Sequence, residues 1–186
     1  EPGIAEQVLK EEKADMVVMG RAQLADPEFV NKVKSGRTED IDYCVGCDQG
    51  CLDGFADPDC PHITCLRNPA VGRERECAIV KADKPETVLI AGGGIAGLQA
   101  AIVLKQRGHN PVLCEASGRL GGQFLTAGMA PRKEEMKQAV EAMAKKAERL
   151  GVNIRLNTCV TDSMIKEIKP HTVFNAIGAV PIIPGI

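Results

Sequence analysis

The chain has 186 residues, of which 44% are hydrophobic and 26% are charged, a balance typical of a globular protein with one or two domains. Its formal net charge is -2 and no long run of lysine or arginine occurs, which argues against a nucleic-acid-binding protein. No apolar stretch reaches the roughly 18 to 20 residues of a membrane-spanning helix, and no basic and then apolar signal sequence opens the chain. We therefore expect a cytoplasmic protein whose partners are small molecules rather than nucleic acid or a membrane.

The first 37 residues predict a helix, a strand and a second helix. An amphipathic pattern predicts the first helix over residues 4–13, and an apolar run predicts a strand over residues 14–19. Asp26 is the expected N-cap of the second helix, with Pro27 at its first position, and Gly36 is its expected end. One parallel strand cannot bury its faces without neighbours, and a parallel barrel needs about 250 residues, so we expect further chain upstream.

Residues 38–83 show neither a helical nor a strand period and are rich in Cys, Asp, Gly and Pro, so we expect loops organised around a ligand. After a linker over residues 82–85, the pattern alternates between strands and helices, which predicts an α/β fold. The strands are expected at residues 87–91, 112–115, 153–157 and 172–176, and the helices at residues 95–107 and 133–150.

Eight cysteines in a chain without a signal sequence are more typical of metal or redox sites than of disulfides. Cys44, Cys47 and Cys51 are closely spaced and Cys65 follows after a longer loop, so four thiolates suit either a 4Fe-4S cluster or a zinc ion. The three residues between Cys47 and Cys51 are less typical of zinc sites and favour the cluster. Cys60 is an alternative fourth ligand. The remaining cysteines are expected to be small, mostly buried side chains without partners: Cys77, Cys114 and Cys159.

A second motif, the glycine turn at residues 92–97, follows an apolar strand and opens a helix. Glu115 ends the next strand about 20 residues later, as in dinucleotide-binding folds. In such folds Gly92 permits a tight turn, Gly94 lets the pyrophosphate approach the helix N-terminus, and Gly97 allows helix and strand to pack closely. Glu115 would then accept hydrogen bonds from the adenosine ribose.

Four motifs in a fixed order resemble the 2,4-dienoyl-CoA reductase and trimethylamine dehydrogenase family of NADH:flavin oxidoreductases. They are GRAQLADP at residues 20–27, CVGCDQGC at 44–51, NPAVGRE at 68–74 and the glycine turn. The resemblance covers the whole chain. It implies the end of an FMN-binding (β/α)8 barrel over residues 1–37, an iron-sulfur segment and linker over 38–83, and a Rossmann-like FAD- or ADP-binding domain over 84–186. It also implies an NAD(P)H-binding domain beyond the end of this chain.

The resemblance assigns cofactor roles but no catalytic residue. Gly20 and Arg21 would hold the FMN phosphate, for which a guanidinium fork is well suited, while most of the FMN site lies outside this chain. Residues 175–179 depart from the family pattern, because the family usually has threonine directly before the glycine that is Gly178 here. The implied metal ligands are Cys44, Cys47, Cys51 and Cys65, and the implied cofactor-binding residues are Gly20, Arg21, Gly92, Gly94, Ile95, Ala96, Gly97, Glu115, Ala116, Arg119, Gly122 and Gln123.

The family contains two kinds of enzyme. Its reductases pass electrons from NAD(P)H through FAD and a 4Fe-4S cluster to FMN, which reduces an activated C=C bond such as that of an enoyl or dienoyl thioester. Its amine dehydrogenases oxidise amines at FMN and keep ADP in the second site. The CVGCDQGC motif looks more like the reductases. We expect the remainder of the same polypeptide to complete the enzyme and the fragment alone to be inactive. A different class, a zinc-stabilised nucleotide-binding module without a redox role, is the alternative.

Overall fold

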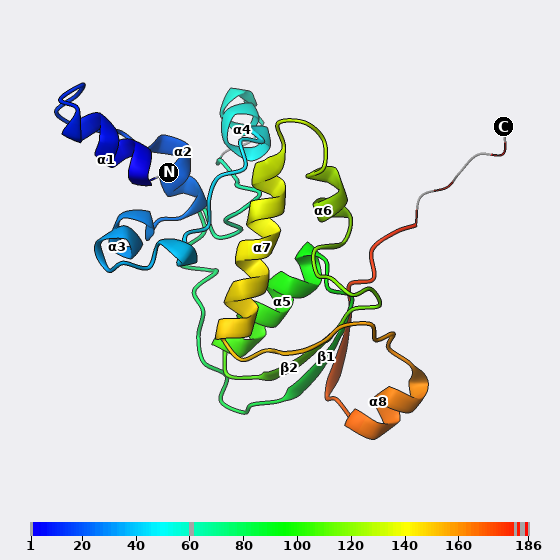
Figure 1. Ribbon diagram of the computed structural model, residues 1–186. Coiled ribbons are helices and arrows are strands. Elements are labelled where there is room, and N and C mark those ends of the chain that lie inside the picture. Colours follow the sequence, from blue (N-terminus) through cyan, green and yellow to red (C-terminus); the bar gives the residue numbers. More distant parts are fainter. Residues whose placement is uncertain (1, 60–61, 181, 183–184, 186) are drawn as a thin grey trace. The chain divides into compact units, whose positions relative to one another are not determined.

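The computed structural model describes residues 2–59, 62–180, 182 and 185 (Figure 1). The chain divides into two compact units, the first ending at Ala78 and the second beginning at Ile79. The boundary predicted after residue 83 lies a few residues beyond this division. The boundary predicted after residue 37 stays a prediction. Among the described residues, no helix combines the length and the apolar character that crossing a membrane requires.

The first unit opens with three helices, α1 (Pro2–Lys10), α2 (Gly20–Ala25) and α3 (Phe29–Lys34). The helix predicted over residues 4–13 is therefore confirmed, although it begins and ends earlier. Its early end has a local cause, because Glu12 has a φ of 53° in the left-handed region, which a helix cannot continue through. The sequence did not predict α2.

The strand predicted over residues 14–19 is wrong, since the described part of the first unit contains no strand. Met16 and Val18 lie 77% and 88% exposed in irregular chain. A parallel strand needs hydrogen-bonded neighbours and cover on its faces, and this segment has neither within its unit. Directly after this segment, Gly20 begins the helix α2.

The helix α3 begins later than predicted, with Glu28 at its N-cap instead of Asp26. Asp26 is instead a buried hydrogen-bond acceptor. It is 3% exposed, and its Oδ1 accepts the backbone N–H of Glu28 at 3.0 Å. The predicted end is confirmed, because Gly36 follows α3 with a φ of 70°. Asp26 is thus a buried acceptor and not an exposed cap.

The segment from residue 38 to residue 78 is mostly irregular, as predicted. Its described residues contain three short helical turns that the sequence did not predict, because none is long enough to show an apolar period. They are the 3-10 turn η1 (Thr38–Asp40), the π-type turn η2 (Gln49–Asp53) and α4 (Gly54–Ala56).

The second unit is built on a four-stranded parallel sheet with strand order β3-β2-β1-β4. The strands are β1 (Thr87–Ala91), β2 (Asn110–Cys114), β3 (Asn153–Arg155) and β4 (Thr172–Asn175), which confirms the predicted strands and the α/β class. The strand β3 is shorter than predicted, because Asn157 has a φ of 51° that breaks an extended chain. The order is that of a doubly wound dinucleotide-binding sheet.

Helices cover both faces of this sheet. The predicted helices are confirmed as α5 (Ile95–Gln106) and α7 (Glu134–Arg149), which lie together on one face, while α8 (Asp162–Ile168) lies on the other (Figure 1). The sequence did not predict α6 (Gly122–Ala127) or α8. A signal for α8 was present, because the Thr161 hydroxyl caps its first turn by accepting a backbone N–H at 3.3 Å.

Alternate residues of β1 supply the two cores. Val88 and Ile90 pack with α5 and α7, whereas Leu89 packs toward α8. Burial on both faces explains why this strand is an unbroken apolar run in the sequence. The arrangement leaves the carboxyl ends of β1 and β4 side by side, and the glycine turn follows the first of them.

Candidate cofactor sites

A cleft of about 350 Å³ opens in the second unit where β1 and β4 end. The strand order reverses at this edge, since β2 and β3 extend the sheet on one side of β1 and β4 on the other. Parallel α/β sheets bind ligands at such a point. The lining comes from the glycine turn, the start of α6 and the segment after β4: Gly92, Gly94, Ile95, Ala96, Glu115, Gly121, Gly122, Gln123, Phe124, Ala176, Ile177, Gly178 and Ala179.

The glycines of the turn face different surroundings. Gly92 has a φ of 107°, and a Cβ there would overlap the carbonyl oxygen of Ala176. A Cβ on Gly97 would overlap the carbonyl oxygen of Gly92. At Gly94, by contrast, a Cβ would meet nothing within 4 Å. The fold therefore needs Gly92 and Gly97, whereas Gly94 leaves open space in the cleft at the N-terminus of α5, where unpaired N–H groups suit a phosphate.

The turn formed by Gly121 and Gly122 lies directly beside the glycine turn of residues 92–97. The N–H of Gly121 donates to the carbonyl of Gly93 at 2.8 Å, and Gly94 and Gly121 form an isolated parallel bridge. A Cβ on Gly122 would come within 3.3 Å of the Cα of Gly94. Two backbone segments that are distant in sequence are thereby brought to one wall of the cleft.

The Glu115 carboxylate is held by the protein at the mouth of the cleft. Its Oε2 accepts the Gly93 N–H at 2.7 Å, and its Oε1 accepts both the N–H and the hydroxyl of Ser117 at 2.8 Å. Burial alone would raise the pKa of Glu115, but these hydrogen bonds from Ser117 and Gly93 outweigh it and lower the pKa, so the group is ionised at neutral pH. A carboxylate accepts roughly four hydrogen bonds, which leaves capacity for a ribose hydroxyl.

A second cleft of about 320 Å³ adjoins the first along Gly92 and Glu115. It is lined by Ala116, one of the predicted residues, and by residues 158–160, which the sequence did not predict at a site because they follow a short strand without a motif. Arg119, also predicted, is exposed and lines neither cleft.

Gln123 spans the first cleft with its side chain. The amide nitrogen donates to the carbonyl of Ala179, so the side chain reaches from α6 to the segment after β4. That segment departs from the family pattern at residues 175–179, yet it still lines the cleft from Ala176 to Ala179. The departure in sequence therefore leaves the backbone wall in place.

In the first unit, one cavity is bordered by all four predicted metal ligands, Cys44, Cys47, Cys51 and Cys65. Each is half-buried, and none forms a disulfide. Among the described residues, no three His, Cys, Asp or Glu side chains converge closely enough to hold one metal ion. The donor set fits a 4Fe-4S cluster, because four cysteines border one cavity and each ligand of such a cluster binds a different iron. Cys60, the alternative ligand, lies outside the described residues.

Two left-handed residues curl the loop that carries Cys44, Cys47 and Cys51. Gly46 has a φ of 62° and Asp48 a φ of 57°. The turn directs the N–H of Gly46 to the Sγ of Cys44 at 3.4 Å. Hydrogen bonds to ligand sulfurs stabilise negative charge on a cluster and so affect its potential.

A backbone contact brings Cys65 to the same cavity. The N–H of Thr64 donates to the carbonyl of Gly50 at 2.9 Å. A Cβ on Gly50 would lie 2.6 Å from the Thr64 carbonyl oxygen, so only glycine permits the approach. Because the next residues along the two segments are Cys51 and Cys65, the contact places the third and fourth ligands together.

Arg21 also lines the cysteine cavity, which the sequence did not predict. Its Nη1 forms an ion pair with Oδ1 of Asp48, and both side chains are about half exposed. The hydrogen bond to Asp48 and the charge of that carboxylate raise the pKa of Arg21. The predicted role at an FMN phosphate stays a prediction, as does that of Gly20, where a Cβ would meet nothing within 4 Å.

The other described cysteines differ from one another. Cys114 is buried, as predicted, and burial raises the pKa of its thiol, so it acts as a small apolar side chain. Cys77 and Cys159 are exposed, so the prediction of burial was wrong for them. Cys77 lies in a turn of the loop-rich segment, and Cys159 follows β3 at the second cleft. At neither position do other described residues cover the side chain.

A cysteine replacement series tests the ligand set. In the full-length protein, we expect Cys65→Ser to lose iron, because Cys65 borders the cavity, whereas the exposed Cys77→Ser serves as the matched control and retains it. We also expect Cys60→Ser to retain iron. Iron and acid-labile sulfide per chain are the measurements. Iron lost from Cys60→Ser but kept in Cys65→Ser would reassign the fourth ligand.

Comparison with known proteins places this chain among oxidoreductases. Residues 87–176 match the family described as FAD dependent oxidoreductase. Cinnamate reductase of Clostridium sporogenes is 35% identical over 184 residues, which cover 97% of this chain and 27% of that protein. The solved structure of 2-naphthoyl-CoA reductase in complex with 2-naphthoyl-CoA has a TM-score of 0.93 and 33% identity, covering 100% of this chain and 28% of that one. Histamine dehydrogenase from Rhizobium sp. 4-9 has a TM-score of 0.88 and 25% identity, covering 96% and 26%.

Proposed function

Because the chain belongs to the 2,4-dienoyl-CoA reductase and NADH:flavin oxidoreductase family, we propose that it carries the FAD and iron-sulfur sites of an enzyme that reduces activated C=C bonds. The observation that supports this most is the presence, in one chain, of a four-cysteine cavity and of a dinucleotide cleft. Electrons would pass from NAD(P)H through FAD and the 4Fe-4S cluster to FMN. The chain spans 26% to 28% of the length of the compared proteins, so the remainder of the polypeptide supplies the substrate pocket in this proposal.

The second unit binds and orients the dinucleotide. Bound FAD accepts a hydride and releases single electrons, which is chemistry that no side chain provides. The open space at Gly94 admits a pyrophosphate to the N–H groups that open α5. Glu115, ionised and held by Gly93 and Ser117, presents an acceptor to the ribose. Gln123, whose amide bridges from α6 to Ala179, would bound the dinucleotide on that side of the cleft.

The first unit holds the cluster. Four thiols around one cavity supply the ligands, and the Gly46 N–H supports the negative charge on Cys44. Arg21 lies at the same cavity, beside Asp48. If Arg21 also holds the FMN phosphate, as the family resemblance implies, then one side chain contacts both the iron-sulfur segment and the flavin of the barrel.

The substrate class in this proposal is an enoyl or dienoyl thioester or a related conjugated acid. The names of two relatives support it, since one acts on cinnamate and the other binds an aromatic acyl-CoA. The cytoplasmic location and the lack of nucleic-acid or membrane partners belong to the proposal as well. Free thiols at the described cysteines suit a reducing compartment.

Amine oxidation with ADP in the second site is the alternative, and the likeness to histamine dehydrogenase is the observation in its favour. The nucleotide released when the purified full-length protein is denatured separates the two. We expect FAD together with FMN, identified by chromatography and mass spectrometry. ADP in place of FAD, combined with oxidation of amines, would overturn the reductase assignment. Zinc in place of iron, with no visible absorption, would indicate a nucleotide-binding module without a redox role.

A further inference from the structure

The side chain of Arg67 is buried beside the cysteine cavity of the first unit. Its side chain is 7% exposed and lines the cavity. The Nη2 donates to Oδ1 of Asp42 at 3.0 Å, and the Nε donates to the backbone carbonyl of Tyr43 at 3.2 Å. A guanidinium keeps its charge at every accessible pH and makes such two-point contacts in a fixed plane.

The two ends of this contact lie next to the first and last cluster ligands. Tyr43 directly precedes Cys44, and Arg67 lies two residues after Cys65. The guanidinium fork therefore joins the chain entering the cysteine segment to the chain leaving it.

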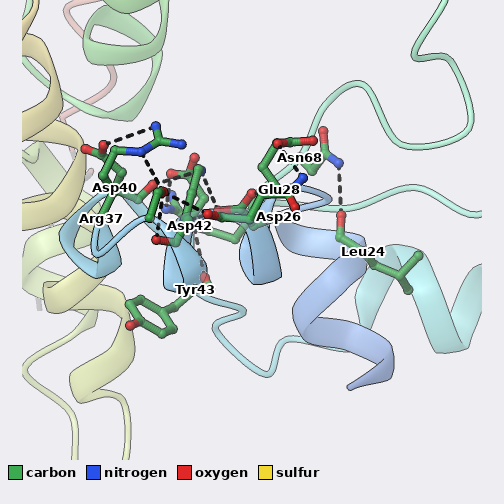
Figure 2. Close-up of polar contacts among 12 residues, drawn as sticks. Leu24, Asp26, Glu28, Arg37, Asp40, Asp42, Tyr43 and Asn68 are labelled. Atoms are coloured by element: carbon green, nitrogen blue, oxygen red, sulfur yellow. Dashed lines mark hydrogen bonds and ion pairs between the residues drawn. The ribbon is translucent and has the colours of Figure 1, made fainter. Parts of the chain in front are cut away.

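The Asp42 side of the contact is itself held by a buried network (Figure 2). The N–H of Asp42 donates to Oδ2 of Asp26 at 2.9 Å, and the Lys32 ammonium donates to the same oxygen at 2.6 Å. Lys32 also donates to the carbonyl of Asp40 at 2.9 Å. Asp26 is 3% exposed, so displacing any member leaves a buried charge or polar group uncompensated. The network thus fixes the position of Asp42, to which Arg67 binds.

We propose that Arg67 is a positioning residue for the 4Fe-4S cluster, fixing the separation of Cys44 and Cys65 and stabilising the reduced cluster with its buried positive charge. The inference rests on the proposed function. The fork acts on geometry and the charge acts on potential, because Arg67 balances the Asp42 carboxylate beside a cluster that gains negative charge on reduction. The two roles separate by substitution: lysine keeps the charge but not the planar fork, and glutamine keeps neither.

The test uses the full-length protein with Arg67→Gln, Arg67→Lys and a control, Arg73→Gln, whose side chain is 55% exposed and does not line the cavity. The measurements are the cluster reduction potential, from an EPR-monitored redox titration, and the rate at which a chelator removes iron. FAD content reports the second unit independently. In Arg67→Gln we expect a lower potential, seen as at least a threefold smaller ratio of reduced to oxidised cluster at a fixed potential, and several-fold faster iron loss. In Arg67→Lys we expect faster iron loss at an almost unchanged potential, and in Arg73→Gln neither change.

A wild-type potential and a wild-type rate of iron loss in Arg67→Gln would overturn the inference. Should Arg67→Gln take up no cluster while its FAD content is normal, Arg67→Lys decides: faster iron loss supports the positioning role, and an unchanged rate refutes it. A protein whose unchanged sequence shows no 4Fe-4S signal would instead refute the proposed function, on which the inference depends.

Discussion

Replacing Cys47 with serine in the intact enzyme is expected to abolish NAD(P)H-driven reduction of the C=C substrate while both flavins stay bound. Cys47 borders the cavity of the first unit, whereas the dinucleotide cleft belongs to the second, so loss of the cluster leaves the FAD site intact. A nicotinamide delivers two electrons as hydride and a 4Fe-4S cluster passes one at a time, so a cluster between two flavins acts as a relay.

The measurement has two parts, made on protein shown to be folded and to contain FAD and FMN. Oxidation of NAD(P)H coupled to substrate should fall to the background rate. Substrate should still reoxidise FMN that has been reduced chemically, because that step does not use the cluster. Cys77→Ser, which changes an exposed cysteine of the same unit, should keep both activities. Normal NAD(P)H-driven turnover in protein without a cluster would show that electrons take another route.

Replacing Gly94 with valine is expected to reduce the FAD content of the full-length protein at least tenfold without unfolding it. A Cβ at this position meets nothing within 4 Å, and Gly94 has a φ of −72° and a ψ of −173°, which any residue adopts. The added methyl groups would therefore occupy the cleft and not the protein interior. FAD per chain, from the absorbance of released flavin, and the melting temperature of flavin-free protein are the measurements.

Gly97→Ala is the matched control for a structural effect at the same turn. The added Cβ would overlap the carbonyl oxygen of Gly92, so the helix must move away from β1 at a cost of about 1–3 kcal/mol. We expect a lower melting temperature of the flavin-free protein in Gly97→Ala and an unchanged one in Gly94→Val. Unchanged FAD content in Gly94→Val would mean that the dinucleotide does not lie at this turn.

The second unit was predicted well because its strands and its two long helices carry strong periodic signals. The strand β1 is apolar on both faces, and α7 repeats its apolar residues over four turns, so tertiary packing and local pattern agree. The strand predicted over residues 14–19 failed for the opposite reason, since a strand depends on neighbours that a local pattern does not reveal. The short helices α6 and α8 have too few residues to show a period.

The candidate sites show the same contrast between residues marked by a local motif and residues brought together only by the fold. The glycine turn and the cysteine cluster were predictable because their chemistry is concentrated in short motifs. Arg67 was not, since its partner Asp42 lies 25 residues away and no spacing rule connects them. The second cleft was missed because residues 158–160 reach it only through the fold. Asp26 was assigned to a helix cap, whereas the folded chain uses it to hold Asp42 and Lys32.

The contact between Gly50 and Thr64 has a consequence for how this segment tolerates changes in length. The contact joins Gly50 to Thr64, so Cys65 is held beside Cys51 by a bond that does not depend on the length of the chain between them. Lengthening a closed loop is inexpensive, at about 0.6 kcal/mol for each doubling. Insertions and deletions in residues 52–63 are therefore compatible with an intact cluster, whereas a side chain at position 50 is not. Among related sequences, the spacing between the third and fourth cysteines should vary freely while the residue before the third stays glycine.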